Sequence, residues 1–389
     1  MDPRTRAKTK RAGASAATGL GLAAAVAGGA AIAGAGLAGR SAVRRSRAYA
    51  VTAPDKVHVF PFETDKVLAV PASDGVVLHV EVDEPPGWSP KRPTVVLVHG
   101  FVLNLSSWIH QRRELVAAGY RVVSYDQRNH GLSESGDLAG CAIDQLGKDL
   151  RAVIDATTPE GDLVLVGHSM GGMTVMSFAG RYPQLTRDRV VGAALIATSA
   201  GGDSLVQLGL GKRFDRIITA LGPTFLGNLS RREGLWGSAR AAGRGIESWA
   251  VQKYAFGSEM PKNLLRQVAT MVFGTKLDAI GAFVPELDCL DIRETLPALV
   301  DTPVLIVAGS RDVLTPPEHS ERLAEALPAA EFTVLPGVGH LLQLERPGAV
   351  ADAILGLLER PHGHDAQQDA RLAKRAVTER KKAVSERTA

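Results

Sequence analysis

The sequence predicts an α/β fold with a mostly parallel, eight-stranded sheet flanked by helices and a helical cap inserted after the sixth strand. Three observations carry this prediction. Short β-branched runs alternate with helical stretches from residue 67 onward. The central runs (VVLV, LVLV and VLIV) lack polar alternation, as strands buried on both faces do. One stretch of about 100 residues, 200–302, interrupts the alternation.

The predicted elements follow one another in a regular order. The first two strands, 67–70 and 76–82, form an antiparallel start around the hairpin turn Asp74-Gly75. Further strands are predicted at 94–98, 121–125, 163–166, 190–197, 304–308 and 332–335. Helices are predicted at 107–118, 143–157, 171–181, 318–327 and 347–359. This alternation is typical of a parallel sheet covered by helices.

The same pattern divides the chain into regions. Residues 66–199 and 303–360 form the predicted α/β core. Residues 200–302 have a helical pattern with large apolar side chains and are predicted to be a cap. Residues 361–389 are polar, with dispersed Lys and Arg, and are predicted to be a disordered tail.

The charges are distributed unevenly along the chain. The formal net charge is +4 and the pI is near 9.1, but residues 1–47 carry nine Lys/Arg against one acid. Residues 361–389 carry seven against four, which leaves 29 Lys/Arg against 36 acids for residues 48–360. An acidic body argues against a nucleic-acid partner, whose basic patch would lie on the fold itself.

An uncharged tract, 12–39, lies within the basic N-terminal segment 1–47. It holds thirteen Ala and eight Gly, is long enough to span a bilayer, and has basic residues on both sides. We predict a membrane anchor or a signal segment, with the body outside the cytoplasm if the span is retained. A flexible Ala/Gly tract is the alternative to an anchor or signal. The alternative locations of the protein are secreted or cytoplasmic.

Other classes of site have no matching pattern. Two cysteines, Cys141 and Cys289, cannot build a disulfide framework; we expect two free buried thiols, with one bridge left open. The cysteines and histidines are not spaced as metal ligands, and no glycine-rich phosphate-binding motif follows a predicted strand. No metal and no cofactor are therefore predicted.

The strongest chemical motif follows the predicted strand 163–166. Here Gly167-His168-Ser169-Met170-Gly171-Gly172 opens a helix. A serine at a tight strand-to-helix turn sits in strained backbone, so its close neighbours Gly167 and Gly171 must be small. The turn exposes the hydroxyl, and Ser169 is therefore the predicted nucleophile.

A serine hydroxyl needs a base to accept its proton as it attacks. His340 lies in Gly337-Val338-Gly339-His340, just past the last predicted strand. Asp312 lies beyond the strand that ends at Ala308 and can orient that imidazole. All three residues follow the carboxyl ends of parallel strands, where α/β sheets place their sites.

The oxyanion formed by the attack requires N–H donors. The backbone amide of Phe101, in His99-Gly100-Phe101 after the strand 94–98, is one candidate. The amide of Met170, directly after the nucleophile, is the other.

Together these motifs resemble the α/β-hydrolase-fold superfamily, of the serine esterase or lipase type with a helical cap. The resemblance covers residues 66–360 and includes five motifs in the family's order. They are His99-Gly100-Phe101, Asp126 to Ser133, Gly167 to Gly172, Gly309 to Asp312 with Pro316 following, and Gly337 to His340. Asn129 departs from the glycine that is common there. The resemblance implies that the acid is Asp312, with Asp203 as the substitute seen in some relatives, and that residues 200–302 cover the active site.

The predicted activity is hydrolysis of carboxylic esters, including lipid-like esters such as monoacylglycerols, through an acyl-enzyme intermediate. A thioesterase, a carbon–carbon bond hydrolase, an acyltransferase or a perhydrolase would use the same three residues. Epoxide hydrolases share only the fold, because they place Asp where this chain has Ser169. The alternative of another class is a non-catalytic protein that binds a ligand in the pocket. The oligomeric state has no signature in the sequence.

Overall fold

The computed structural model describes residues 63–202 and 248–360. They form one eight-stranded sheet with the order β1-β2-β4-β3-β5-β6-β7-β8. The strands are β1 (Lys66–Pro71), β2 (Val77–Asp83), β3 (Thr94–Val98), β4 (Val122–Tyr125), β5 (Leu163–His168), β6 (Val190–Ile196), β7 (Val304–Gly309) and β8 (Glu331–Leu335). The β1–β2 and β2–β4 pairs are antiparallel, and every other pair is parallel. The predicted fold class is confirmed.

The antiparallel start turns at the predicted dipeptide Asp74-Gly75. Gly75 has φ of 89°, which suits glycine, and its N–H donates to the carbonyl of Ala72. The Asp74 carboxylate accepts from the N–H of Val76 at 3.3 Å. These local bonds set the register in which Val70 faces Leu78.

Burial explains the missing alternation in the central strands. Every residue of β3, β5, β6 and β7 is buried, whereas the edge strand β1 has one buried residue and the edge strand β8 has none. Helices therefore cover both faces of the sheet centre, as uninterrupted apolar runs require.

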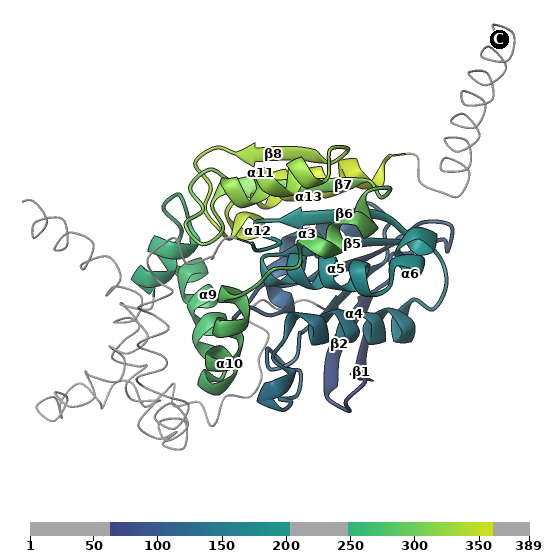
Figure 1. Cartoon of the computed structure of the whole chain (residues 1–389), viewed down its shortest axis with the longest axis horizontal. Helices are drawn as coiled ribbons and strands as arrows, with labels where there is room; N and C mark the ends of the chain where they lie inside the picture. The colour runs from purple at the N-terminus through teal and green to yellow at the C-terminus, as the bar shows by residue number, and fades with distance from the viewer. Residues whose placement is uncertain (1–62, 203–247, 361–389) are drawn as a thin grey trace, which may run out of the picture.

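Two helical layers enclose the sheet (Figure 1). One apolar core joins one face to α4, α5 and α11, and a second core joins the other face to α3 and α13. These helices are α3 (Ile109–Ala117), α4 (Ile143–Thr157), α5 (Met170–Arg181), α11 (Pro317–Ala326) and α13 (Pro347–Leu358). Each predicted helix of the core is present, with bounds that differ by two residues at most.

Several short helices have no strong signal in the sequence. They are η5 (Leu105–Trp108), η6 (Leu138–Gly140), α6 (Pro183–Arg189) and α12 (Leu342–Glu345). The η5 turn replaces the first residues of the helix predicted at 107–118, because the Asn104 side chain accepts from the N–H of Ser106 and starts a turn there.

The described part of the insertion contains α9 (Lys262–Gly274), α10 (Leu277–Asp288) and η8 (Arg293–Leu299). Apolar side chains of α9 pack with Leu103, Leu341 and Leu344, all from loops or short helices at the carboxyl ends of the strands. The α10 residue Phe283 is fully buried. The described insertion thus packs on the end of the sheet where the predicted site lies (Figure 1), and its boundaries at 200 and 302 stay a prediction.

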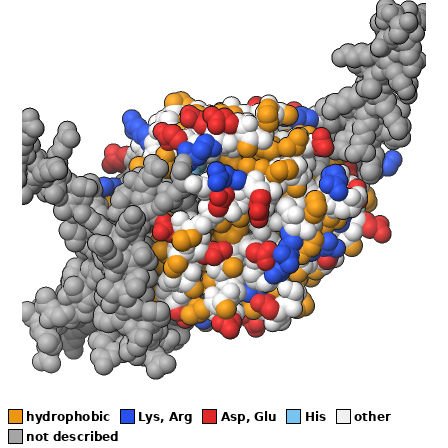
Figure 2. All heavy atoms as spheres, viewed as in Figure 1, with side chains coloured by type: hydrophobic (Ala, Val, Ile, Leu, Met, Phe, Trp, Pro, Cys, Tyr) orange, Lys and Arg blue, Asp and Glu red, His pale blue; other side chains and the backbone are white. Residues whose placement is uncertain are grey.

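The two termini with their predicted anchor (12–39) and tail (361–389) lie outside the described residues. Within the described ranges, no single helix is long and apolar enough to cross a membrane; α9 and α10, bent by 88°, meet that criterion only as a pair. Acidic, basic and apolar side chains are mixed on the face shown in Figure 2.

Both cysteines are free thiols. Cys141 is buried as expected, and burial raises the pKa of its thiol to about 11. The expectation that Cys289 is buried was wrong, because this residue follows the end of α10 and is exposed.

Candidate active site

Ser169 lies between the last residue of β5 and the first residue of α5, with φ of 52° and ψ of −121°. Such backbone is strained by about 1–3 kcal/mol for a residue other than glycine. A Cβ atom on Gly167 would lie 2.4 Å from the carbonyl oxygen of Gly171. One on Gly171 would lie 2.1 Å from the carbonyl oxygen of Val98. Both positions therefore need glycine, and the turn holds Ser169 at the N-terminal end of α5.

Asp312 and His340 form a buried, hydrogen-bonded pair. Asp312 follows β7, His340 follows β8, and Nδ1 of His340 lies 2.8 Å from Oδ2 of Asp312. The other carboxylate oxygen accepts from the main-chain N–H groups of Leu314 and Thr315, at 2.8 and 3.0 Å. This geometry orients the carboxylate toward the imidazole ring.

Electrostatics keeps Asp312 ionised. Burial alone would raise the pKa of this carboxyl group, but the positive charge and hydrogen bond of His340 and the Thr315 and Leu314 amides lower it below its usual value. A carboxylate facing Nδ1 keeps the proton on that nitrogen, so Nε2 is the nitrogen that can accept another proton.

Thr315 ties this pair to the sheet. Its hydroxyl oxygen lies 2.9 Å from Oδ2 of Asp312, 3.2 Å from Nδ1 of His340 and 2.9 Å from the carbonyl oxygen of Ala197. Ala197 directly follows β6 and has φ of 46°. The Asp312 carboxylate is therefore linked through Thr315 to the end of β6, the strand that pairs with β5, and β5 ends just before Ser169.

His168 connects the serine turn to the histidine loop. Its Nε2 donates to the main-chain carbonyl of His340 at 2.9 Å, and the two ring centroids are 4.8 Å apart. Burial lowers the pKa of His168 to about 3, with a further contribution from the charge of His340. His168 is thus neutral, and it places the turn that carries Ser169 beside His340.

The loop 99–102 passes directly against Ser169. A Cβ atom on Gly100 would lie 3.1 Å from the Cβ of Ser169. Phe101, whose amide is a predicted oxyanion donor, is the next residue. Met170, whose amide is the second predicted donor, is the first residue of α5, where N–H groups have no partner within the helix. The loop that carries Phe101 and the first residue of α5 thus lie next to Ser169, and the role of their two amides as donors stays a prediction.

Two neutral histidines hold this loop. His99 accepts from the N–H of Gln127 at Nε2 (2.9 Å), and its Nδ1 donates to the carbonyl of Gly100 (2.8 Å). His130 accepts from the N–H of Val102 at 3.1 Å. Burial lowers the pKa of His99 well below its ordinary value and that of His130 to about 4. Neither ring competes with His340 as a base near neutral pH.

Glu345 is a residue that the sequence reasoning missed. Its buried carboxylate accepts from the N–H groups of Gly257 (2.9 Å), Ser258 (2.7 Å) and Gly339 (2.9 Å) and from the Ser258 hydroxyl (2.5 Å). It therefore fastens the insertion to the loop that carries His340. The signal that could have found it is an acidic residue five positions after the histidine, directly after the leucine-rich run Leu341-Leu342-Gln343-Leu344.

The alternative acid, Asp203, lies outside the described residues. Across residues 63–202 and 248–360, no three His, Cys, Asp or Glu side chains are grouped so that they could hold a metal ion.

Known proteins share this architecture. A family model for the alpha/beta hydrolase fold matches residues 93–347, which is more than half of the chain. The protein belongs to the alpha/beta hydrolase family. The matched residues of this alpha/beta hydrolase include Ser169, Asp312 and His340.

The chain is also similar to individual proteins. An uncharacterized protein of Mycobacterium tuberculosis is 28% identical over 277 residues, which is 67% of this chain and 74% of the relative. Epoxide hydrolase B of the same organism is 36% identical over 135 residues, 34% of this chain and 36% of that protein. A thermophilic esterase of Thermogutta terrifontis has a similar structure, with a TM-score of 0.60 and 26% identity over 77% of this chain and all of that one.

Proposed function

We propose that this alpha/beta hydrolase is a serine hydrolase that cleaves carboxylic esters through an acyl-enzyme intermediate. The observation that carries the proposal is the 2.8 Å hydrogen bond between Asp312 and His340, whose main-chain carbonyl accepts from His168, the residue before the strained Ser169. A nucleophile, a base and a group that orients the base are the parts that acyl transfer requires. Similarity to an esterase supports the same reaction class.

The proposed reaction has two stages, acylation of the serine and hydrolysis of the acyl-enzyme. Oγ of Ser169 attacks the ester carbonyl carbon while Nε2 of His340 accepts the hydroxyl proton. The imidazolium is stabilised by Asp312 and gives this proton to the leaving alcohol as the carbon–oxygen bond breaks. Water then attacks the acyl-enzyme, His340 again takes and returns a proton, and the carboxylic acid leaves. Each step balances without any co-reactant other than water.

The amides of Phe101 and Met170 would stabilise the negative oxygen of the tetrahedral intermediate. Each donor contributes on the order of 3 kcal/mol to the transition state when it is aligned in advance. The hydrogen bonds of His99 and His130 to the loop 99–102 support this alignment, because they hold the main chain on both sides of Phe101.

The proposed substrates are esters with apolar acyl groups, with monoacylglycerols as one example. The support comes from α10, where the Phe283 ring meets Phe101 edge-on with centroids 5.9 Å apart. An aromatic side chain of the insertion thus lies against the loop that carries a proposed oxyanion donor. Attachment to a membrane through residues 12–39, with the body outside the cytoplasm, belongs to the same proposal and rests on composition alone.

The test is hydrolysis of p-nitrophenyl esters from two to sixteen carbons, together with labelling by a fluorophosphonate probe. We expect turnover with a defined chain-length optimum and labelling that Ser169→Ala abolishes. Ser89→Ala, in the loop between β2 and β3, is the matched control and should label as the wild type does. Equal labelling of the wild type and Ser169→Ala would overturn the assignment of the nucleophile.

The same assay separates the alternatives. Turnover of acyl thioesters with no turnover of oxygen esters would indicate a thioesterase, and peracid formation with hydrogen peroxide would indicate a perhydrolase. Neither labelling nor turnover of any acyl substrate would favour a ligand-binding protein.

A further inference from the structure

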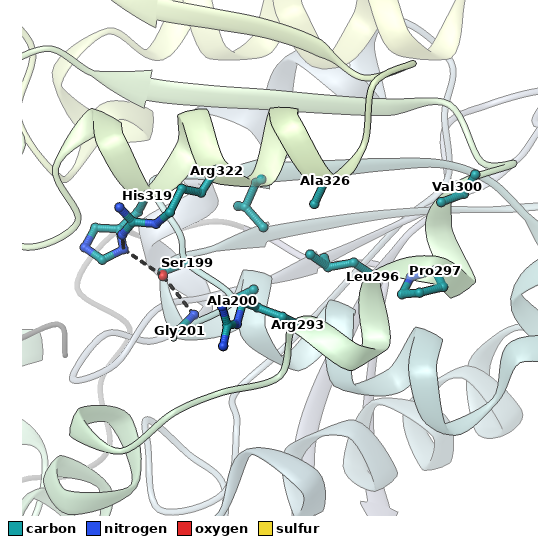
Figure 3. A pocket seen from close by; sticks show the side chains of 11 residues that line it. Ser199, Ala200, Gly201, Arg293, Leu296, Pro297, Val300, His319, Arg322 and Ala326 are labelled. Atoms are coloured by element: carbon teal, nitrogen blue, oxygen red, sulfur yellow. Dashed lines mark hydrogen bonds between the residues drawn. The ribbon is translucent and has the colours of Figure 1, made fainter. Parts of the chain in front are cut away.

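A pocket of about 200 Å³ lies between α11 and η8, beside the segment that follows β6 (Figure 3). Side chains of α11 line one wall and those of η8 line the other, and residues 199–201 close one end. None of the residues to which the proposed reaction assigns a role lines this pocket.

One end of the pocket is polar. Oγ of Ser199 lies 2.9 Å from Nδ1 of His319 and accepts from the N–H of Gly201 at 3.0 Å. Arg322 donates to the same Nδ1 at 2.8 Å. Because a guanidinium can only donate, Nδ1 of His319 is an acceptor and its proton lies on Nε2. The polar end therefore combines a buried hydroxyl, a neutral imidazole and a positive charge.

Two guanidinium groups stand among the described residues of the lining. The described lining residues include Arg293 and Arg322 but no carboxylate. Arg293 is paired with Asp291, which lies outside the lining, at 2.7 and 2.9 Å. A guanidinium carries five N–H donors in a planar fork, so it can bind an anion while it keeps a partner.

The other end of the pocket is apolar. Leu296 and Pro297 of η8 face Ala326 of α11 across it, and Val300 lies at the far end (Figure 3). Leu323 of α11 also lines the pocket. Leu296 and Leu323 are buried, whereas Val300 is 48% exposed. A polar, cationic end joined to an apolar channel matches a small ligand with one anionic group and a short hydrocarbon chain.

We propose that this pocket binds a short-chain monocarboxylic acid in its carboxylate form. The carboxylate takes two parallel hydrogen bonds from Arg322, the pairing that a guanidinium favours. The chain lies between η8 and α11. A volume of about 200 Å³ corresponds to roughly six or seven water-sized groups, because one water occupies about 30 Å³ in the liquid. This space fits a carboxylate with a chain of about four carbons.

The pocket is next to groups that hold the active site. Thr198, the neighbour of Ser199, donates from its hydroxyl to the carbonyl of Ser169 at 2.7 Å. The helix α11, which carries His319 and Arg322, begins two residues after Thr315. Monocarboxylic acids are also the products that the proposed ester hydrolysis would release. This link to the product rests on the proposed function, whereas the other observations on the pocket do not.

Isothermal titration of the full-length Ser169→Ala protein tests the proposal without any need for turnover. Butanoate, pentanoate and hexanoate are the ligands, and 1-pentanol and pentanamide are the uncharged comparators. We expect saturable binding of the carboxylates, with affinity at least tenfold above that of the comparators. Equal affinity for pentanoate and 1-pentanol, or no saturable binding of any acid, would overturn the proposal.

Variants made in the same background locate the binding. Arg322→Gln should weaken pentanoate at least tenfold, and Ala326→Leu, at an exposed position on the pocket wall, should block it. Arg187→Gln, which removes an exposed charge on α6, is the matched control and should change nothing. If Arg322→Gln does not fold, Ala326→Leu alone decides. An unchanged affinity for pentanoate in Ala326→Leu would mean that the acid binds outside this pocket, and the proposal would be wrong.

Discussion

The side chain of His168 donates a hydrogen bond of 2.9 Å to the main-chain carbonyl of His340, a residue 172 positions further along the chain. The carbonyl oxygen can only accept, so Nε2 of His168 carries the proton. Because burial lowers the pKa of His168 to about 3, the ring stays neutral. The bond therefore positions the proposed base relative to the serine turn without placing a competing charge there.

Replacing His168 by Phe should keep a ring but remove this donor. We expect kcat to fall by about 10²-fold with a smaller change in KM, because displacement of a reacting group by about 1 Å has effects of that size. Steady-state kinetics on a p-nitrophenyl ester measure the split between kcat and KM. A variant whose KM rises while kcat is unchanged would show that His168 does not position the base.

Replacing Asp312 by Asn should lower kcat by about 10⁴-fold while the fold stays intact, because an amide no longer holds the reactive tautomer of His340 or stabilises its charged form. The kcat for a p-nitrophenyl ester and the thermal midpoint, both compared with wild type, check this. Asp203→Asn is the paired variant. If it lowers kcat and Asp312→Asn does not, Asp203 is the acid.

The buried histidines predict how stability depends on pH. Their pKa values in the folded protein, about 3 for His168 and about 4 for His130, lie below the ordinary 6.5. Below pH 6.5 the unfolded chain binds protons that the folded chain does not, so acid favours unfolding until the folded pKa values are reached. Each ring should therefore remove about 1.4 kcal/mol of unfolding free energy per pH unit in this window.

Urea unfolding at pH 7 and pH 5 measures this loss. His130→Gln keeps a side-chain acceptor for Val102 but no longer titrates, so its loss between these pH values should be smaller by about 2 kcal/mol. Equal losses in wild type and His130→Gln would mean that His130 can take up a proton in the folded protein.

Glu345→Gln should loosen the insertion. In the wild type, the carboxylate accepts hydrogen bonds from the N–H groups of Gly257, Ser258 and Gly339. The side-chain NH₂ group of glutamine is itself a donor, so it cannot accept from them. We expect a loss of about 2 kcal/mol of unfolding free energy, because buried donors lose their acceptor, together with a lower kcat/KM. Urea unfolding and ester kinetics check both. Glu114→Gln, at an exposed position on α3, is the matched control and should leave both values unchanged.

Gly171→Ala should prevent close packing of α5 on β3, since its Cβ would lie 2.1 Å from the Val98 carbonyl oxygen. We expect a loss of about 3 kcal/mol or more. Gly348→Ala, in a helix where a Cβ would meet nothing within 4 Å, should instead stabilise by about 0.5–1 kcal/mol. Thermal unfolding of the two variants compares them directly, and similar midpoints would contradict the packing argument.

Local patterns were enough to predict the core fold. Buried runs without alternation identified the central strands, Asp74-Gly75 identified the hairpin, and glycines around Ser169 identified the turn. Each of these is a property of a few consecutive residues. The burial of Cys289 was predicted wrongly, because the exposure of a helix end depends on what packs against it.

The sequence by itself determined which residue types follow the carboxyl end of each strand, because strand burial and turn chemistry act over short distances. Only the tertiary structure decided which of these residues meet. Three features join segments that are far apart in the chain. They are the strand order, in which β3 lies between β4 and β5, the hydrogen bond of His168 to His340, and the hydrogen bond of Gly257 to Glu345. Such contacts depend on how helices and loops pack on the finished sheet, and no local pattern encodes that packing.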